Sequence, residues 1–241
     1  YGEVIFAIAP SPIQKDLIWA GTNDGKIWYT KDAGKSWTDV TRNVTGMPEW
    51  GTITKIEPSR FDPAVAYVVV DYHLMDHRDP FIYKTTDLGR SWKNLSAGLP
   101  KGQALSYAIS LAENPNRKGM LFAGTGNGFY YSLDDGVTWT PFKEGLPAAR
   151  VTWVVVQKEH HDVVVSTYGR GLYILRGRHA ARAVGPGVGH CGGPSVRATP
   201  RLPPRPQRPR RAHVLVEVGA FGAGEARDSG RDGCGRPRAF V

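Results

Sequence analysis

One eight-residue pattern occurs three times in this chain and limits the possible fold more than any other feature. The copies are TKDAGKSW (residues 30–37), TTDLGRSW (85–92) and SLDDGVTW (132–139). Each reads Ser/Thr, any residue, Asp, any residue, Gly, any residue, Ser/Thr, Trp. Steps of 55 and 47 residues separate the three Asp positions, and a repeat of about 40–50 residues has the length of one four-stranded propeller blade. The spacing therefore predicts a β-propeller.

The residue types in the pattern suit a tight turn between two strands. Gly can adopt the positive φ that such a turn requires. The Asp carboxylate and the Ser/Thr hydroxyls can bond the amides of the turn, and the Trp can bury a large apolar surface against its own blade. We therefore assign structural roles, as turn formers and packing anchors, to Asp32, Gly34, Trp37, Asp87, Gly89, Trp92, Asp134, Gly136 and Trp139.

Runs of β-prone residues around the three copies complete the predicted blades. The expected strands lie at 1–9, 17–22, 26–30 and 37–41, at 52–57, 66–71, 81–85 and 92–95, at 107–112, 120–125, 129–132 and 139–142, and at 151–157, 162–167 and 172–175. Where a fourth copy of the pattern is due, the repeat stops. The predicted fold class is all-β, a partial β-propeller of about three and a half four-stranded blades with a disordered C-terminal tail.

The formal net charge of +9 belongs to the last part of the chain. Residues 1–175 hold equal numbers of basic and acidic residues, so the whole excess lies in residues 176–241, which are rich in Arg, Gly and Pro. This composition favours disorder over a packed core. We therefore expect a propeller segment, 1–175, and a tail, 176–241, that is disordered or the product of a shifted reading frame. A nucleic-acid partner is expected only if the tail is genuine.

The sequence does not indicate a membrane-spanning or a nucleotide-binding protein. There is no run of about 20 apolar residues, so no membrane span is expected. A Gly-rich phosphate loop followed by a helix is also missing, and we predict no cofactor and no metal site. The chain begins at Tyr1 and not at Met, so we expect any signal peptide of the protein to be missing from this sequence. Its oligomeric state is left open.

The predicted ligand-binding face lies opposite the three repeated turns, where the loops between second and third strands meet the connections between blades. The longest of these loops (72–80) carries His73, Asp76, His77, Arg78 and Asp79. Long loops on a rigid scaffold often carry function. Asp76 or Asp79 could act as an acid or base, and His73 with His77 could bind a ligand or even a metal. The alternative is a solvated loop.

Two further residues are candidates for ligand binding on the same face. Trp50 precedes an expected inner strand and could stack on a sugar or a peptide side chain, or else pack in the core. Arg170 lies between Gly169 and Gly171. It could project towards the centre of the propeller and bind a carboxylate with two hydrogen bonds, or it could simply shape a hairpin turn.

The repeated pattern matches the Asp-box, or bacterial neuraminidase repeat, and the wider sequence resembles bacterial sortilin-like propeller proteins that are often labelled glycosyl hydrolases. The stretches KGMLFAGTGNGFYYSLDDGVTW (118–139) and DVVVSTYGRGLYIL (162–175) carry this resemblance, which covers residues 1–175. It implies a polypeptide or glycan ligand and a place outside the cytoplasm. The chain departs from the family pattern at Tyr168, where a His is usual, and at Arg176, where paired acids usually follow.

Two functions are compatible with this resemblance. The first is a sortilin-like module, part of a larger ring, that binds a polypeptide or glycan and is not itself an enzyme. The alternative is an exo-acting glycoside hydrolase, of the sialidase or xyloglucanase type, with catalytic carboxylates partly in missing blades. Hydrolysis of this kind needs two carboxyl groups at a defined separation, and the sequence offers no catalytic candidates beyond Asp76 and Asp79.

Overall fold

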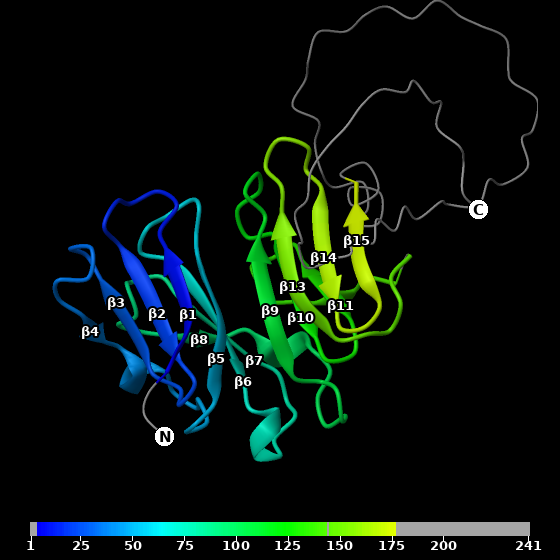
Figure 1. Ribbon diagram of the computed structural model, residues 1–241, viewed down its shortest axis with the longest axis horizontal. Coiled ribbons are helices and arrows are strands. Elements are labelled where there is room, and N and C mark those ends of the chain that lie inside the picture. Colours follow the sequence, from blue (N-terminus) through cyan, green and yellow to red (C-terminus); the bar gives the residue numbers. More distant parts are fainter. Residues whose placement is uncertain (1–3, 144, 177–241) are drawn as a thin grey trace, which may run out of the picture.

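The computed structural model of the protein describes residues 4–143 and 145–176. These residues form three four-stranded antiparallel sheets and one three-stranded sheet, each joined in simple chain order. Figure 1 shows the sheets following one another as blades along the chain. The prediction of an all-β partial propeller with about three and a half blades is confirmed. Apart from Arg176, the predicted tail lies outside the described residues.

The strand boundaries follow the predicted repeat closely. Blade 1 contains β1 (Ile5–Pro10), β2 (Ile18–Thr22), β3 (Ile27–Thr30) and β4 (Thr38–Asp39). Blade 2 contains β5 (Thr52–Pro58), β6 (Ala66–Asp71), β7 (Phe81–Thr85) and β8 (Lys93–Asn94). Blade 3 contains β9 (Ala108–Glu113), β10 (Leu121–Thr125), β11 (Phe129–Ser132) and β12 (Thr140–Pro141). Blade 4 contains β13 (Val151–Val156), β14 (Val163–Thr167) and β15 (Gly171–Leu175).

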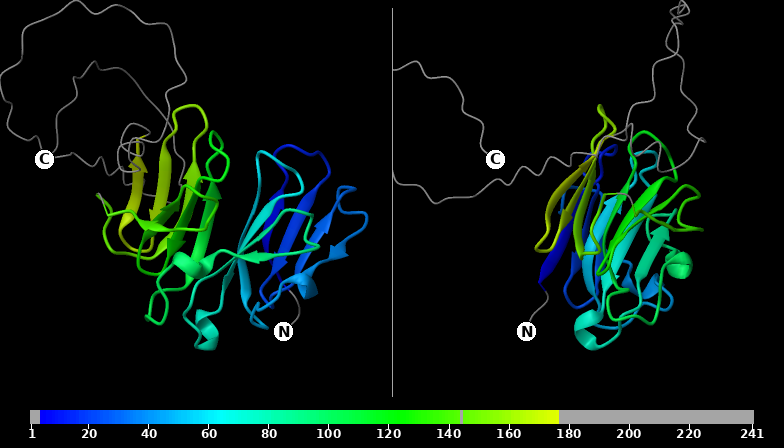
Figure 2. Two further views of the ribbon diagram at one scale, coloured as in Figure 1. Left: turned by 180° about the vertical axis from the view of Figure 1, so that it is seen from behind. Right: turned by 90° about the vertical axis from the view of Figure 1, so that its right-hand side faces the viewer.

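The first strands of the blades lie next to one another. Strand β5 contacts β1 and β2 of the preceding blade, β9 contacts β5 and β6, and β13 contacts β9 and β10. Figure 2 shows the resulting fan of sheets from two further directions. Each sheet therefore packs face to face on its neighbours, and the inner strands β1, β5, β9 and β13 gather on one side.

A repeated cross-strand row explains why successive blades pack. In blades 2, 3 and 4 an aliphatic residue, a small aliphatic residue and an aromatic residue lie side by side on one face and pack against the preceding blade. The rows are Ile56–Val68–Tyr83, Leu111–Ala123–Tyr130 and Val154–Val165–Tyr173. Such cross-strand pairs are the unit from which sheets gain stability. The apolar core is accordingly divided into three clusters, one between each pair of neighbouring blades.

The Asp-box turns are built from the same hydrogen bonds in each copy. In the second box, Thr85 Oγ1 donates to Asp87 Oδ1 at 2.8 Å, and the backbone N–H of Ser91 donates to the same oxygen at 2.9 Å. Ser91 Oγ donates to Asp87 Oδ2 at 2.6 Å, while the N–H of Gly89 donates to Thr85 Oγ1. Gly89 has a φ of +79°, which an L side chain rarely adopts. Each carboxylate is thus used to close its own turn.

The box tryptophans differ from expectation in what they pack against. We expected each Trp to anchor the turn to its own blade. Trp92 of blade 2 donates from Nε1 to the Gly89 carbonyl of its own turn, as expected, but it also packs edge-on against Trp19 of blade 1. Trp139 of blade 3 donates from Nε1 to the Leu95 carbonyl in the segment that follows blade 2. Trp37, in the first described blade, is 42 % exposed. A box therefore fastens its blade to the preceding one.

Candidate functional site

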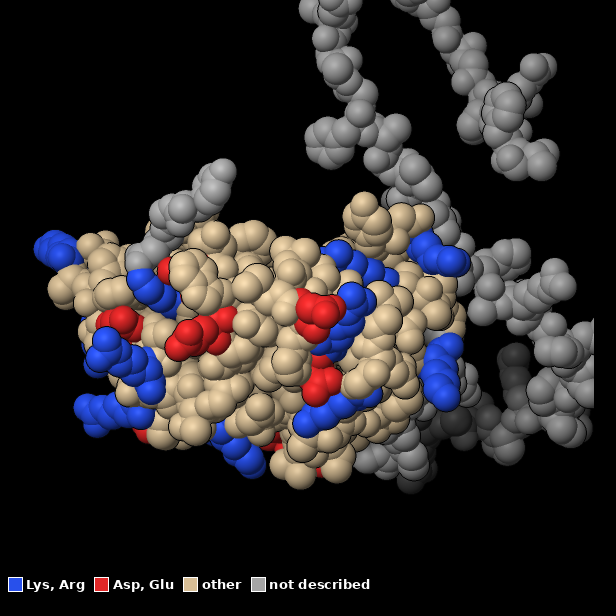
Figure 3. Space-filling model, turned by 90° about the horizontal axis from the view of Figure 1, so that it is seen from below, with Lys and Arg blue, Asp and Glu red and all other residues tan. Residues whose placement is uncertain are grey.

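The two ends of the blades carry different segments. Every box turn follows a third strand, so the turns between second and third strands and the connections between blades lie at the opposite end, here called the loop face. Three short 3-10 helices contribute to its connections and its long loop: Thr41–Asn43, His73–Met75 and Ser96–Gly98. Figure 3 views the molecule from this end and shows acidic and basic side chains interspersed on it. No large region of a single charge sign dominates the face in that view.

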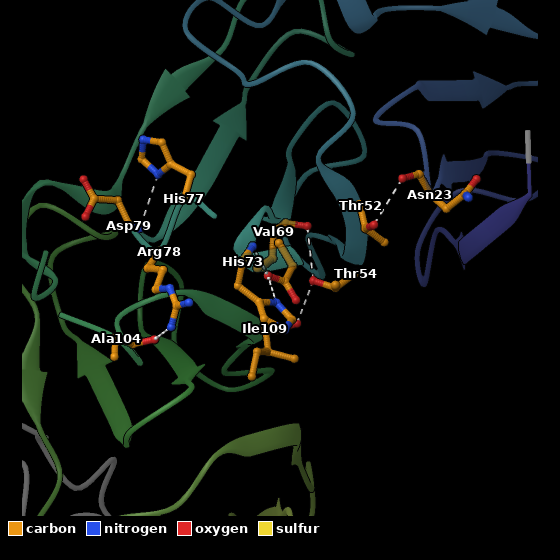
Figure 4. A network of polar contacts seen from close by, with 11 residues as sticks. Asn23, Thr52, Thr54, Val69, His73, His77, Arg78, Asp79, Ala104 and Ile109 are labelled. Atoms are coloured by element: carbon orange, nitrogen blue, oxygen red, sulfur yellow. Dashed lines mark hydrogen bonds and ion pairs between the residues drawn. The ribbon is translucent and has the colours of Figure 1, made fainter. Parts of the chain in front are cut away.

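The loop that joins β6 to β7 holds a histidine in a fixed position. His73 Nδ1 lies 2.6 Å from Asp71 Oδ1, and the same carboxylate oxygen accepts the His73 backbone N–H. The imidazole stacks on Tyr107 with ring centres 4.2 Å apart and planes 10° from parallel, and Arg150 approaches the Tyr107 ring at 5.6 Å. Figure 4 also shows Thr54 of β5 donating to the Ile109 carbonyl of β9. A carboxylate that holds one ring nitrogen orients the imidazole.

The other candidates of this loop contact the connection between blades 2 and 3 or the loop itself. Asp79 Oδ1 accepts the backbone N–H of Gly102 at 2.8 Å. Arg78 donates to the Ala104 carbonyl at 3.3 Å and lies 3.5 Å from Asp76, whose side chain is 93 % exposed. Figure 4 shows the contact of Arg78 with the Ala104 carbonyl. These contacts give Asp76 and Asp79 roles in shaping the loop, and their catalytic assignment stays a prediction.

His77 does not join His73. Its ring packs against Phe81, with centres 5.2 Å apart, and against Tyr72 at 6.0 Å. Among the residues that the structure describes, no three His, Cys, Asp or Glu side chains gather in a way that could hold a metal ion. The two histidines are thus held by different partners.

Trp50 lies at the edge of a groove between the β2–β3 turn of blade 1 and the segment that joins blade 1 to blade 2. Its side chain is 63 % exposed, and its backbone has a φ of +65°, a conformation that costs a bulky residue roughly 1–2 kcal/mol. The groove measures about 590 Å³ and includes Asp24, Lys26, Arg42, Met47 and Glu49. The alternative that Trp50 packs in the core is excluded by its exposure.

The groove also contains a carboxylate oxygen without a hydrogen-bond partner. Asp24 Oδ1 is buried and accepts no bond from the described residues, while Asp24 Oδ2 lies 3.7 Å from Lys26 Nζ. The turn that carries Asp24 is held close to Trp50: a Cβ added to Gly25 would lie 3.0 Å from the Gly51 carbonyl oxygen. An unsatisfied buried acceptor is costly, so Asp24 Oδ1 is a source of strain in this turn.

Arg170 lies exposed in the turn between β14 and β15. Gly169 and Gly171, on either side of it, have φ values of +77° and +84°, and Thr167 Oγ1 donates to the Gly171 carbonyl across the turn at 2.7 Å. The conformation of the turn accounts for the two glycines. The proposed binding of a carboxylate by Arg170 stays a prediction.

A second cavity, the channel pocket, lies among the inner strands. It measures about 440 Å³ and is lined by Phe6 of β1, by Lys55 and Glu57 of β5, and by Arg60 and Trp153. Lys55 Nζ lies 3.2 Å from Glu57 Oε2 and 4.2 Å from the centre of the Trp153 ring. Sequence reasoning missed this pocket because its residues come from three different blades.

One buried carboxylate beside the channel pocket is fully engaged in the fold. Glu113 Oε2 accepts Ser59 Oγ at 2.7 Å and the Arg60 backbone N–H at 3.0 Å. Tyr67 donates its hydroxyl to Asp135 at 2.9 Å and lies 3.4 Å from Glu113. Burial and these two carboxylates raise the pKa of Tyr67. This cluster joins blade 2 to blade 3 and has little capacity left for a ligand.

No helix in residues 4–143 and 145–176 is both long and apolar enough to cross a membrane. The described helices are the three single turns on the loop face.

Curated proteins similar to this chain are xyloglucanases. The chain is 27 % identical over 136 residues to a xyloglucanase of a Paenibacillus species, a match that covers 53 % of this chain and 13 % of that protein. It is 28 % identical to xyloglucanase Xgh74A of Acetivibrio thermocellus over 136 residues, which cover 53 % of this chain and 16 % of the relative. The chain thus spans about one seventh of the length of these relatives.

Solved structures share the fold at low sequence identity. The GH74 enzyme of Niastella koreensis superposes with a TM-score of 0.54 at 17 % identity, covering 72 % of this chain and 28 % of that one. YCF48, solved bound to D1 peptide, superposes with a TM-score of 0.51 at 16 % identity, covering 71 % of this chain and 51 % of the other. At these identities the likeness concerns the fold alone.

The family match is more extensive. Residues 25–173 match the Sortilin-Vps10 family, described as "Sortilin, neurotensin receptor 3". This range begins in the first described blade, includes all three Asp-boxes and ends in β15. Because it covers more than half of the chain, the protein belongs to the Sortilin-Vps10 family.

Proposed function

We propose that the chain is a glycan-binding propeller module whose ligand groove lies on the loop face, between the β2–β3 turn and the segment that joins blades 1 and 2. One observation carries this proposal: Trp50 is exposed in a strained, left-handed backbone conformation beside a groove of about 590 Å³. Strained residues that the surrounding structure holds in place often mark binding sites.

The composition of the groove suits a sugar. An exposed indole offers a flat apolar surface for the C–H face of a pyranose ring, since aromatic side chains combine a large apolar area with a defined geometry. Asp24 lines the groove with a carboxylate that can accept a hydrogen bond from a hydroxyl. Lys26 and Arg42 are balanced by Asp24 and Glu49 among the lining residues, which favours a neutral ligand over a strongly charged one.

A polypeptide ligand is the other possibility that the sequence leaves open. YCF48, which shares the fold, has been solved bound to D1 peptide. The names of the curated relatives favour a glycan, because these proteins are xyloglucanases. We therefore place the glycan first, and with it a location outside the cytoplasm, where such polymers are met.

Calorimetric titration with a xyloglucan oligosaccharide tests the proposal. Trp50→Ala should weaken binding at least about tenfold if stacking contributes the ~1.4 kcal/mol that corresponds to that factor. Trp37→Ala is the matched control, because Trp37 is also exposed but does not line the groove. Binding that is unchanged in Trp50→Ala would refute the groove as the site. Binding of unrelated peptides with a similar dependence on Trp50 would favour the polypeptide ligand.

The second candidate function is glycoside hydrolysis. The specific support is the similarity to xyloglucanases, and the loop carboxylates Asp76 and Asp79 are the candidates raised by the sequence. Such hydrolysis needs a proton-donating acid and a second carboxylate placed about 5–10 Å from it. Turnover of xyloglucan or aryl glycosides by the protein that is lost in Asp76→Ala or Asp79→Ala would establish this function. Turnover that persists in both variants would exclude these two residues.

A further inference from the structure

The channel pocket is separate from the groove at Trp50. It opens between the inner strands and is lined by residues 6–10 of β1 and residues 54–58 of β5, whereas Trp50 precedes the N-terminal end of β5. No described residue lines both the groove and the channel pocket. A ligand in one does not occupy the other.

Trp153 supplies an aromatic surface in this pocket. Its side chain is 47 % exposed, although it belongs to the first strand of a blade, where the neighbouring Val154 is buried at 2 %. Lys55 from blade 2 reaches the ring and lies 4.2 Å from its centre. A cation over an indole is attracted by the ring's quadrupole, and this contact holds Trp153 in position.

Polar groups accompany the indole. Lys55 is also paired with Glu57 at 3.2 Å, so its charge is largely compensated inside the pocket. Burial raises the pKa of the Glu57 carboxyl, with Lys55 acting in the opposite direction. Held by Lys55, the Glu57 carboxylate can accept a hydrogen bond from a ligand hydroxyl. The Arg60 side chain is exposed and adds planar donors at the rim.

We propose that the channel pocket is a second subsite for a neutral pyranose ring, with Trp153 as the stacking surface and Glu57 and Arg60 as its hydrogen-bonding partners. The inference rests on the proposed glycan-binding function and adds a site to it. A cavity of about 440 Å³ falls within the roughly 300–1,000 Å³ typical of small-ligand sites. Its few polar groups beside an apolar wall resemble the usual composition of such sites.

Calorimetric titration of the whole chain with a xyloglucan oligosaccharide separates the two sites. Wild-type protein should show two binding events. Trp153→Ala should weaken one of them at least about tenfold, Trp50→Ala should weaken the other, and Trp37→Ala should change neither. Glu57→Ala should weaken the same event as Trp153→Ala by about fivefold, while Glu57→Gln, which keeps a donor and an acceptor, should weaken it less.

The outcomes distinguish the two proposals. A single binding event that Trp50→Ala abolishes and Trp153→Ala leaves unchanged overturns the channel subsite and keeps the groove. A single event that depends on Trp153 and not on Trp50 keeps the channel subsite and overturns the groove. No binding by folded wild-type protein overturns both. An event at Trp153 that requires a glucuronic acid substituent on the oligosaccharide overturns the assignment to a neutral sugar.

Trp153→Phe replaces Trp153→Ala if the latter unfolds, as judged by near-ultraviolet circular dichroism. The smaller ring keeps the contact with Lys55 but offers less area, so an affinity between those of wild type and the Glu57→Ala variant is expected. Wild-type affinity in Trp153→Phe together with wild-type affinity in Glu57→Ala would overturn the subsite.

Discussion

The indole N–H of Trp139 donates a 2.8 Å hydrogen bond to the backbone carbonyl of Leu95. This bond joins the third Asp-box to the segment that follows the last strand of blade 2, and the ring itself is only 8 % exposed. The N-terminal Asp-box has no equivalent contact in the described part of the chain, and its Trp37 is 42 % exposed. The Trp of the Asp-box therefore contributes a different amount to stability in different blades.

Trp139→Ala should destabilise the protein far more than Trp37→Ala. Removal of a buried Trp costs about 3–5 kcal/mol, whereas substitutions at exposed positions change stability by about 0.5 kcal/mol. The free energy of unfolding of each variant, measured in urea, checks this. Trp92, which is half-buried against Trp19, should fall between the two. Equal losses for Trp37 and Trp139 would show that the boxes stabilise their own blades.

The sequence predicted the architecture because the signals that define it are local. Box residues four positions apart, such as Asp87 and Ser91, bond each other within one turn, and strand patterns repeat with each blade. The exposure of Trp37 could not be predicted, since it depends on which blade lies next to it. The pairing of His73 with Asp71 had a local signal, two residues apart, that was overlooked.

The candidate sites were less predictable than the fold. Trp50 and its loop-face location could be proposed from the sequence, but the left-handed conformation of a Trp has no clear local signal. The contact of Lys55 with Trp153 joins strands that are almost 100 residues apart. It depends on the curvature of the inner strands, which follows from the packing of three blades and cannot be read from any one of them.

Substitution by Ala should destabilise the protein more at Gly136 than at Gly34, although both are glycines of Asp-box turns. Gly34 and Gly136 have φ values of +93° and +80°, so both substitutions carry a backbone cost of roughly 1–2 kcal/mol. An added Cβ on Gly136 would lie 2.8 Å from Leu95 Cδ1, whereas on Gly34 its nearest neighbour is Trp37 at 3.8 Å. Overpacking should therefore add about 1–3 kcal/mol to Gly136→Ala alone. Urea unfolding of both variants measures this difference, and similar losses would contradict the proposed contact between the box and the preceding blade.

The box carboxylates should make stability depend on acid pH. Hydrogen bonds from Ser91 lower the pKa of Asp87 to about 2, and hydrogen bonds from Thr138 lower that of Asp134 to about 2. Because these pKa values lie below those of the unfolded chain, the stabilisation is present above about pH 4 and is lost as the pH falls towards about 2.

Asp87→Asn tests that dependence. The amide does not titrate, so the variant should be less stable than wild type near neutral pH, and the difference should shrink as the pH falls through the range from about 4 to about 2. Urea midpoints across a pH series provide the measurement. A difference that stays constant across the series would mean that the Asp87 charge contributes nothing to the turn.

Glu57 should make the stability of the protein depend on pH in the opposite direction. Burial raises its pKa, against the influence of Lys55, Arg60 and the backbone N–H of Glu113. The folded protein therefore holds this proton more tightly than the unfolded chain, so the contribution of the neutral carboxyl is fully present below the unfolded pKa of about 4.3 and is lost as the pH rises through the folded value. Glu57→Gln, which stays neutral, should gain stability relative to wild type as the pH rises through that interval. Thermal unfolding of both proteins at matched pH values checks this, and a relative stability of Glu57→Gln that falls with rising pH would show that Glu57 is stabilised as a carboxylate by Lys55.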